Sequence, residues 1–407
     1  MQELSLEQRL LIMSESMRLT EKAFAHWENA IITPDELGVL AEEFFRKAAT
    51  AEKRADFQIV MWEYFGKLRN AHSNYFDRVA SFPHGGMVNF SLLLLGGAWV
   101  VKEDDSGLLR TGDEVISVEG KPLKEWLDEI GRLTGITNWR SMIGRLPYYL
   151  SHFCSEEQIK IEIMDEQSCR RSFALPRKSI DFEAQNHGET TGRWLLHKKR
   201  AYIHIPSFNH PKFEERALGL LEEFRDASSI IIDVRGNGGG STPGRLTHHL
   251  MNRPYRWWKE QARHPEFLRQ RHPNSKIRFA TDYSYAETEP DFIDPSIQIA
   301  YSGKLILLVD RFTGSAAEDF ILPFIDNNRA TIIGERTFGS TGQTLFRNFD
   351  HGNIIVMVGA VRSLLPNGGS FEGFGLVPDI EVSIRREDLY QNRDIALEKA
   401  LELMEIR

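Results

Sequence analysis

Two segments of the sequence combine a buried type of strand with groups that can do chemistry. The first runs from the apolar stretch 230–234 into the glycine-rich run 236–240, and the second runs from 305–310 into Ser315. Each strand leads into a turn or helix start whose backbone N–H groups are exposed. The pair therefore predicts a serine nucleophile beside an oxyanion hole, in which backbone N–H groups bind the negative oxygen of a reaction intermediate.

The glycine-rich run 236–240 has alternative interpretations. Glycines also let backbone N–H groups surround a phosphate, but a dinucleotide fingerprint needs a third glycine where Ser241 stands, and the Gly-Lys-Ser/Thr ending of a phosphate loop is missing. A purely structural turn stays open. For an oxyanion hole, we expect the donors to be the backbone N–H groups of Gly239 or Gly240 and of Ala316.

Ser315 lies at a predicted helix start. There the helix dipole favours a partly deprotonated hydroxyl, and the N–H of Ala316 has no helical acceptor. The surrounding residues do not form a Gly-x-Ser-x-Gly pattern, which disfavours an α/β-hydrolase. A serine in this position is by itself more often an N-cap, so the nucleophile hypothesis depends on the other motifs of the chain.

Composition narrows the functional classes. The chain has 407 residues, is 41% hydrophobic and is long enough for more than one packed core. Its 58 acidic and 50 basic side chains give a net charge of −8, which argues against a nucleic-acid-binding protein. The cysteines, Cys154 and Cys169, lack metal-ligand spacing, and the adjacent His248 and His249 point to different faces, so we expect no metal site and a reducing compartment.

The start of the chain lacks the basic residues and apolar core of a signal peptide. The longest apolar run, 92–101, is interrupted by Gly96 and Gly97 and is shorter than the roughly 18 to 20 residues that span a bilayer. We therefore expect a cytoplasmic protein that does not associate with membranes, unless a leader has been trimmed.

The pattern of apolar residues predicts a multidomain α+β and α/β protein. Helical spacing covers a region 1–80, short β runs characterise 85–180, and alternating strands and helices, including a strand over 354–358, build a layered α/β domain over 190–407. A polar, basic and aromatic insertion interrupts that domain at 252–295. The insertion either covers the active site, offering apolar contacts and cations to a peptide, or is a solvated flap with buried tryptophans.

The middle segment contains a glycine-rich turn at 107–113, a strand at 114–118, a tight turn and a helix at 123–130. This order resembles the second half of a PDZ domain of the bacterial type. A further helical stretch, 139–153, indicates that the predicted PDZ-like module is either enlarged or degenerate.

Five motifs, each with a strand or a glycine-rich turn, follow one another along the chain at 202–208, 231–239, 309–316, 333–339 and 372–379. In this order they resemble the C-terminal processing, or tail-specific, serine peptidase family. The resemblance covers most of the chain. It implies a crotonase-like ββα catalytic core, cleavage of proteins or peptides near their C-termini, and no cofactor.

The sequence differs from the family pattern at the position of the general base. Members of the family with a Ser-Lys dyad carry the lysine in the segment that aligns with 337–343, and here Ser340 stands in its place. A hydroxyl has no useful basicity near neutral pH. The branch of the tricorn protease instead uses a histidine before the PDZ domain and a late glutamate, and the matching positions are His72 and Glu372.

Tricorn-type sites also place a serine before the histidine, and this chain has Ala71 there. Glu372 would then orient His72 directly, through water, or through Ser73. An imidazole with an ordinary pKa near 6.5 suits a base at neutral pH.

The sequence thus predicts a serine endopeptidase with Ser315 as nucleophile, His72 as base and Glu372 as the orienting group. We expect it to bind a protein or peptide substrate and to bind neither nucleic acid nor membranes. A homo-oligomer stays open. The alternatives are a non-catalytic ligand- or peptide-binding protein on the same fold, and a PDZ scaffold.

Overall fold

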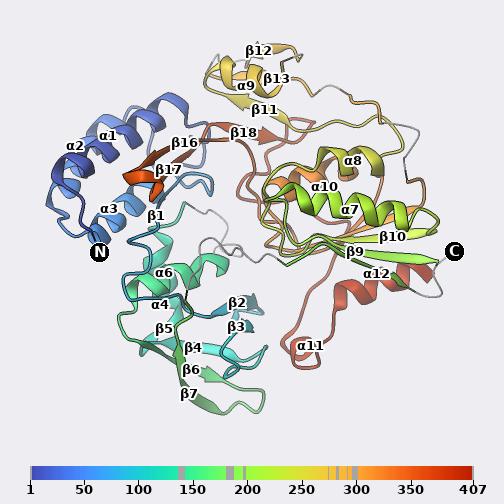
Figure 1. Cartoon of the computed structure of the whole chain (residues 1–407), viewed down its shortest axis with the longest axis horizontal. Helices are drawn as coiled ribbons and strands as arrows, with labels where there is room; N and C mark the ends of the chain where they lie inside the picture. Colours follow the sequence, from blue (N-terminus) through green and yellow to red (C-terminus); the bar gives the residue numbers. More distant parts are fainter. Residues whose placement is uncertain are drawn as a thin grey trace. The chain divides into compact units, whose positions relative to one another are not determined.

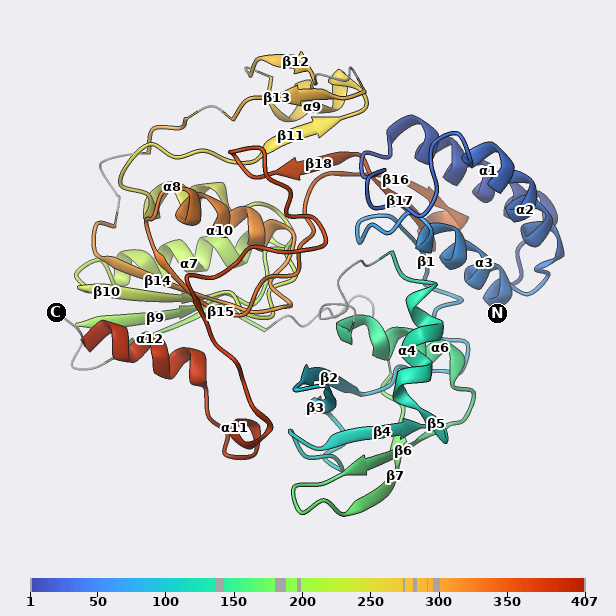
Figure 2. The same cartoon turned by 180° about the vertical axis from the view of Figure 1, so that it is seen from behind.

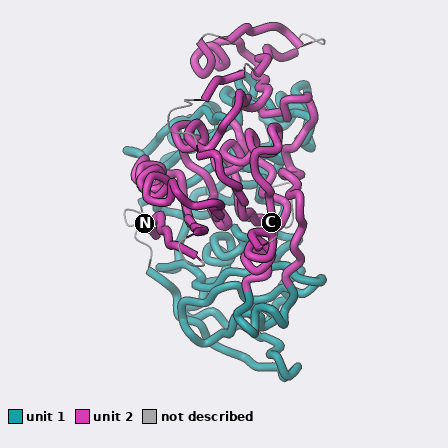
Figure 3. The backbone as a smooth tube through the Cα atoms, turned by 90° about the vertical axis from the view of Figure 1, so that its right-hand side faces the viewer, with its two compact units in different colours: residues 1–183, 343–361, 385–393 teal, residues 184–342, 362–384, 394–407 magenta. Residues whose placement is uncertain are grey.

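The computed structural model describes residues 2–135, 143–179, 188–195, 199–273, 275–280, 284–290, 292–295 and 301–405. The chain forms two compact units, coloured separately in Figure 3. Unit 1 contains Met1–Glu183, Gln343–Val361 and Arg385–Arg393, and unit 2 contains Ala184–Gly342, Arg362–Ile384 and Asp394–Arg407. The protein is therefore a mixed α/β protein of more than one unit, in which the chain leaves unit 2 and returns to it. The domain boundaries inferred from the sequence stay predictions.

The first part of unit 1 is helical, as the apolar spacing predicts. It contains α1 (Leu6–Ala23), α2 (Leu37–Thr50) and α3 (Arg54–Gly66). Helix α1 begins at a capping box, because the Ser5 hydroxyl accepts from the N–H of Gln8 and the Gln8 side chain accepts from the N–H of Ser5. No helix in the described part of the chain is both long and apolar enough to cross a membrane.

A small sheet follows, with the order β1 (Asn74–Asp77), β17 (Ile354–Gly359) and β16 (Thr344–Phe349). The sequence assigned the strand at 354–358 to the α/β domain, and this assignment was wrong. The strand pairs antiparallel with β1, with Tyr75 opposite Val356. A continuous apolar run fits a buried parallel strand equally well, so local periodicity does not identify the sheet that a strand joins.

The rest of unit 1 is an antiparallel sheet, beside which the described residues form two helices and a short 3-10 turn. Its strands lie in the order β2 (Phe90–Leu95), β3 (Ala98–Asp104), β4 (Glu114–Val118), β6 (Gln158–Met164) and β7 (Arg170–Pro176), and β5 (Lys121–Pro122) pairs with β4. Its helices are α4 (Leu123–Gly131) and α6 (Leu146–Phe153), with η1 (Ile143–Arg145) before α6 and the later α11 (Arg386–Tyr390) in the same unit. The predicted helix over 139–153 is thus present from Leu146, and its first residues, 139–142, lie outside the described residues.

Unit 2 is built on a mostly parallel sheet (Figure 1). The strands lie in the order β19 (Ile380–Glu381), β15 (Thr331–Gly334), β14 (Lys304–Val309), β10 (Ser229–Asp233), β9 (Arg200–His204) and β8 (Thr191–Leu195), and β8 runs antiparallel to β9. Every residue of β10 is buried, as expected for a parallel strand that is covered on both faces.

Helices cover both faces of this sheet (Figures 1 and 2). They are α7 (Pro211–Glu223), α8 (Gly244–Leu250) and α10 (Ala316–Asp326) on one face and α12 (Ile395–Glu405) on the other. Side chains alternate along a strand, so Ile230 and Ile232 join the core beneath α7 and α10, whereas Ile231 joins the core beneath α12. The two cores hold the strand ends in fixed positions.

The predicted insertion has its own secondary structure. It contains β11 (Lys259–Ala262), α9 (Pro265–Arg271), β12 (Ile277–Phe279) and β13 (Ala286–Thr288). These strands form a sheet with β18 (Val361–Leu364), in the order β12-β13-β11-β18. The described residues of the insertion therefore form a small module of strands and one helix within unit 2, and both alternatives for its role stay predictions.

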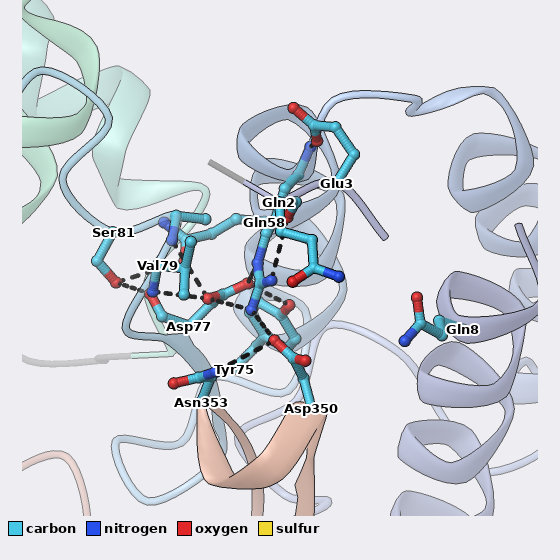
Figure 4. Close-up of polar contacts among 12 residues, drawn as sticks. Gln2, Glu3, Gln8, Gln58, Tyr75, Asp77, Val79, Ser81, Asp350 and Asn353 are labelled. Atoms are coloured by element: carbon cyan, nitrogen blue, oxygen red, sulfur yellow. Dashed lines mark hydrogen bonds and ion pairs between the residues drawn. The ribbon is translucent and has the colours of Figure 1, made fainter. Parts of the chain in front are cut away.

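A buried ion-pair cluster anchors strand β1 within unit 1 (Figure 4). The guanidinium of Arg54, at the start of α3, donates to both oxygens of Asp77 at 2.6 and 2.9 Å and to Asp350 at 2.6 Å. Asp77 is the last residue of β1 and also accepts from the backbone N–H groups of Val79 and Ala80. Arg54 is 1% exposed and Asp77 is fully buried, so each charge depends on the other for compensation.

We expect Arg54→Met to lower the free energy of unfolding by about 3–5 kcal/mol, because it leaves the Asp77 carboxylate buried without a counter-charge. Urea denaturation followed by circular dichroism measures the change. Arg46→Met is the control, since Arg46 forms an exposed pair with Glu42 and its loss should cost less than about 0.5 kcal/mol. Equal effects of the two substitutions would contradict this account of the cluster.

Candidate active site

The order of the sheet brings three loops of unit 2 together. Strands β10, β14 and β15 are parallel neighbours, so their carboxyl ends lie at one edge of the sheet. The glycine-rich run follows β10, Ser315 follows β14, and the segment 335–341 follows β15. This edge is where open α/β sheets bind their ligands.

Ser315 occupies a strained turn between β14 and α10. Its φ of 53° and ψ of −125° lie in a region that costs a non-glycine residue on the order of 1–3 kcal/mol. The backbone N–H of Ser315 donates to the carbonyl of Ser340 at 3.0 Å and to Glu318 Oε2 at 3.2 Å, which fixes the turn. A strained strand-to-helix turn is also how α/β-hydrolases expose their serine, although the Gly-x-Ser-x-Gly pattern is absent here.

Gly239 packs directly against this turn. Its φ is +101°, and a Cβ added to it would lie 2.6 Å from the Cβ of Ser315 and 2.8 Å from the N of Ala316. The N–H of Gly239 donates to Asn237 Oδ1 at 2.9 Å, and the carbonyl of Asn237 accepts from the N–H of Gly314 at 3.0 Å. Asn237 thus fastens the glycine-rich run to the segment that carries Ser315.

Gly240, the second predicted donor, has a different neighbour. A Cβ on Gly240 would lie 2.2 Å from the backbone of Phe208, and its φ is +135°. Phe208 donates its N–H to the carbonyl of Gly239 at 2.9 Å, and its carbonyl accepts from Ser241 at 2.8 Å. The backbone of this segment therefore fits only glycine at these two positions.

Glu318, in the first turn of α10, is buried beside Ser315. Among the described residues its carboxylate accepts from the N–H groups of Ser315, Gly339 and Ser340 and from the Thr337 hydroxyl. Burial raises the pKa of Glu318 to about 8, although these donors favour the charged form. Glu318 was not among the predicted site residues, and its signal in the sequence is an acidic pair in the first turn of a largely apolar helix.

Glu372 lies on the loop between β18 and β19. Its Oε1 accepts from the Ser340 hydroxyl at 2.7 Å, so the residue that replaces the family's lysine is a partner of the predicted orienting carboxylate. The loop is tied to the segment after β15 by the N–H of Gly373, which donates to the carbonyl of Gly339 at 2.6 Å. Ser315, Ser340 and Glu372 are therefore linked within unit 2.

His72 belongs to unit 1 and lies just before β1. Its backbone N–H donates to Asn70 Oδ1 at 3.2 Å, and the Ser73 hydroxyl donates to the same oxygen at 2.9 Å. Ser73 also accepts from the N–H of Gly359 on β17, at 3.0 Å. The hydroxyl of Ser73 is thus engaged within unit 1, which disfavours a relay through it.

The electrostatic surroundings of His72 favour a neutral imidazole. Although part of the residue remains accessible to solvent, desolvation, together with the positive charge of Arg145, lowers the pKa of His72 to about 4. Arg145 also donates to the carbonyl of Ala71 at 3.3 Å, which places this cation against the same segment.

The structure therefore brings Ser315, Ala316 and Gly239 into contact within unit 2 and links Ser315 to Glu372 through Ser340. His72 is held by a separate set of contacts within unit 1. The sequence did not reveal the roles of Asn237 and Asn70, because an asparagine in a turn carries no signal for its distant hydrogen-bond partners.

Comparison with known proteins identifies the fold of this region. Residues 199–382 match the family model described as Peptidase family S41. This segment is similar to the domain that defines the family. The resemblance drawn from the five motifs is confirmed, and the members of this family are serine peptidases.

Two curated relatives cover different shares of the chain. The tricorn protease of Thermoplasma volcanium is 21% identical over 420 residues, which cover 96% of this chain and 35% of that protein. The carboxyl-terminal-processing protease of Synechocystis sp. is 27% identical over 209 residues, which cover 50% of this chain and 43% of that protein. The chain thus spans less than half of the length of each of these relatives.

A solved structure extends the similarity to the whole fold. The structure of mature CPAF complexed with lactacystin has a TM-score of 0.73 and 16% sequence identity, and the match covers 98% of each chain. At this level of identity the comparison shows a shared fold. Residues 199–382 and the N-terminal regions of this chain therefore belong to a known mixed α/β architecture.

We expect Gly239→Ala to destabilise the protein by about 1–3 kcal/mol, because the added methyl overpacks the contact with Ser315. It should also slow the reaction of Ser315 with a fluorophosphonate probe at least about tenfold, since one disturbed donor is worth 2.7 kcal/mol or more. Gly238→Ala is the matched control, because nothing lies within 4 Å of a Cβ at Gly238. Equal effects at both positions would contradict the packing argument.

Proposed function

We propose that this protein is a serine endopeptidase. The observation that carries the proposal is Ser315, which stands in a strained turn at the positive end of α10 with Gly239 and the N–H of Ala316 packed beside it. A hydroxyl in this setting is exposed to donors that stabilise an oxyanion. The match of the 199–382 segment to Peptidase family S41 supports the same chemistry.

In the proposed mechanism, Ser315 Oγ attacks the scissile carbonyl while His72 accepts the hydroxyl proton. The N–H of Ala316 and a glycine N–H bind the oxyanion, and the glycine is Gly240, or Gly239 after it leaves its bond to Asn237. His72 returns the proton to the leaving amine, which leaves an acyl-enzyme. Water, deprotonated by His72, then hydrolyses the acyl-enzyme, and Glu372 orients the imidazole throughout.

We further propose that the α/β layers of unit 2 form a crotonase-like core and that the sheet of unit 1 with α4 is a PDZ-like module. The substrate we propose is a protein or peptide cleaved near its C-terminus. The names of two relatives support this choice, the carboxyl-terminal-processing protease of Synechocystis sp. and the tail-specific protease of Haemophilus influenzae. The proposed reaction uses no cofactor.

The rival proposal is a non-catalytic binding protein on the same fold. Such a protein has no need for a strained serine beside a glycine-rich run, since backbone strain persists only where the surroundings enforce it and clusters at functional sites. A neutral imidazole also has a ring nitrogen that can accept a proton, which the proposed base requires.

We expect a fluorophosphonate probe to label the wild-type protein at Ser315. Ser315→Ala should abolish both labelling and hydrolysis of a fluorogenic peptide pool, and His72→Ala should lower the labelling rate by at least about a thousandfold, as loss of a triad base does. His84→Ala, an exposed histidine in the same unit, is the control and should retain full activity. Wild type that resists the probe, or Ser315→Ala that reacts like wild type, would refute the proposal.

The pH dependence of kcat/KM should report the neutral state of His72. Only the neutral imidazole accepts a proton, and with its pKa lowered to about 4 the acid limb should lie near pH 4 and not near the ordinary value of about 6.5. Arg145→Gln removes a repulsive charge and should move this limb upward, whereas Arg46→Gln should not move it. If the acid limb of the wild-type profile lies near the ordinary histidine pKa, then either another residue is the base or His72 has different surroundings from those described here.

A further inference from the structure

A second acidic residue of α10, Asp319, joins three segments of unit 2. Its carboxylate is 7% exposed and lies one helical turn after Ser315. Among the described residues it accepts from Thr242 at 2.6 Å, from Thr341 at 2.8 Å and from the indole N–H of Trp258 at 2.7 Å. These donors come from the end of the glycine-rich run, from the segment after β15 and from the insertion.

Trp258 also contacts the loop that carries Glu372. Its indole is 3% exposed and stacks on the ring of Phe371, with a centroid distance of 4.4 Å and an interplanar angle of 29°. Phe371 is 1% exposed and directly precedes Glu372, whose Oε1 accepts from Ser340. One side chain of the insertion therefore touches both the helix that begins at Ser315 and the segment that carries Glu372.

We propose that Trp258 is a positioning residue that holds the Glu372 segment in register with the α10 helix through its contacts with Asp319 and Phe371. This inference rests on the proposed function, in which Glu372 orients His72. It also gives the insertion a role, because Trp258 directly precedes β11 of that module and lies in the core of unit 2.

The chemistry of the indole explains why tryptophan suits this place. It donates one hydrogen bond from its edge and offers a flat apolar face for stacking. A phenylalanine would stack on Phe371 but would leave Asp319 short of a donor, and a buried acceptor that loses a donor is costly. A leucine would lose both contacts.

The neighbouring Trp257 is a matched comparison. It is half-buried, and its ring meets Tyr255 edge-on at 5.6 Å with an interplanar angle of 81°. Replacing Trp257 by phenylalanine removes the same atoms as the corresponding change at Trp258, one residue away along the chain.

The first experiment compares Trp258→Phe with Trp257→Phe in the full chain. We expect Trp258→Phe to lower kcat for peptide hydrolysis about tenfold or more with KM changed less than about twofold, because one hydrogen bond to a buried carboxyl group is lost. Trp257→Phe should stay within about twofold of wild type in both constants. An unchanged kcat in Trp258→Phe, or equal losses in the two variants, would overturn the proposal.

The second experiment asks whether Trp258 acts through Glu372. Fluorophosphonate labelling rates are measured for Trp258→Phe alone, Glu372→Gln alone and the double variant. If Trp258 positions Glu372, its substitution should cost less than about twofold once Glu372 is neutralised, since residues that act as a unit are non-additive. Losses that multiply fully would indicate a merely structural role and overturn the inference.

Amide hydrogen exchange separates this inference from the proposed function. In Trp258→Phe, and in Phe371→Leu as an independent break of the same contact, exchange over residues 370–376 and 340–342 should be at least about tenfold faster than in Trp257→Phe. If the wild type hydrolyses no peptide, the proposed function fails while exchange still reports whether Trp258 holds the loop. Unchanged exchange in both variants would refute the positioning role even in an active enzyme.

Discussion

The arrangement around Ser315 depends on two adjacent buried carboxylates in the first turn of α10. Glu318 accepts hydrogen bonds from the Ser315 turn and from the segment 337–340, and Asp319 accepts from the glycine-rich run, the insertion and Thr341. Buried carboxyl groups are expensive unless they are hydrogen-bonded, so each one fixes the donors around it. The positive end of the helix dipole adds to the stabilisation of both groups.

The hydrogen bonds to these two side chains can form because the sheet places their donors close together. The carboxyl ends of β10, β14 and β15 are brought to one edge by parallel pairing, with Ile231 opposite Ile306 and Leu307 opposite Ile332. Apolar cores on both faces of these strands resist relaxation of the strained turn at Ser315. Packing therefore offsets the strain of that turn, together with the hydrogen bonds that Asn237 accepts from the N–H groups of Gly239 and Gly314.

Local sequence patterns predicted most of the elements of this fold. The strand at 230–234 and the helix start at Ser315 were identified because a continuous apolar run is typical of a buried strand and a helix start carries capping and acidic residues. The partner of β17 was missed, because pairing with β1 is a contact between segments far apart in the sequence. The contact of Trp258 with Asp319 was missed for the same reason, because it joins segments far apart in the sequence. The aromatic residues of the insertion are equally typical of a surface flap and of a buried contact.

Local sequence patterns likewise predicted some of the site residues and missed others. The positions of Ser315 and Gly239 were predictable because a strand followed by a helix start or a glycine-rich turn has a recognisable pattern. The partners of Glu318 were not predictable, because hydrogen bonds to Gly339 and Ser340 arise from backbone groups that any residue could present. His72 was assigned from a family resemblance, and its low pKa follows from burial and Arg145, which the sequence does not encode locally.

Ser340 connects the missing lysine to the proposed use of a histidine. A lysine at this position would place a cation beside Glu372 and neutralise its field, whereas the Ser340 hydroxyl orients the carboxylate with a neutral donor and leaves its charge intact. In the proposed mechanism His72 becomes an imidazolium during attack, in surroundings that oppose a cation. In that mechanism the Glu372 carboxylate offsets this opposition, since a nearby opposite charge favours the protonated ring. Under the proposed mechanism, the serine in place of lysine and the use of His72 with Glu372 are two parts of one electrostatic change.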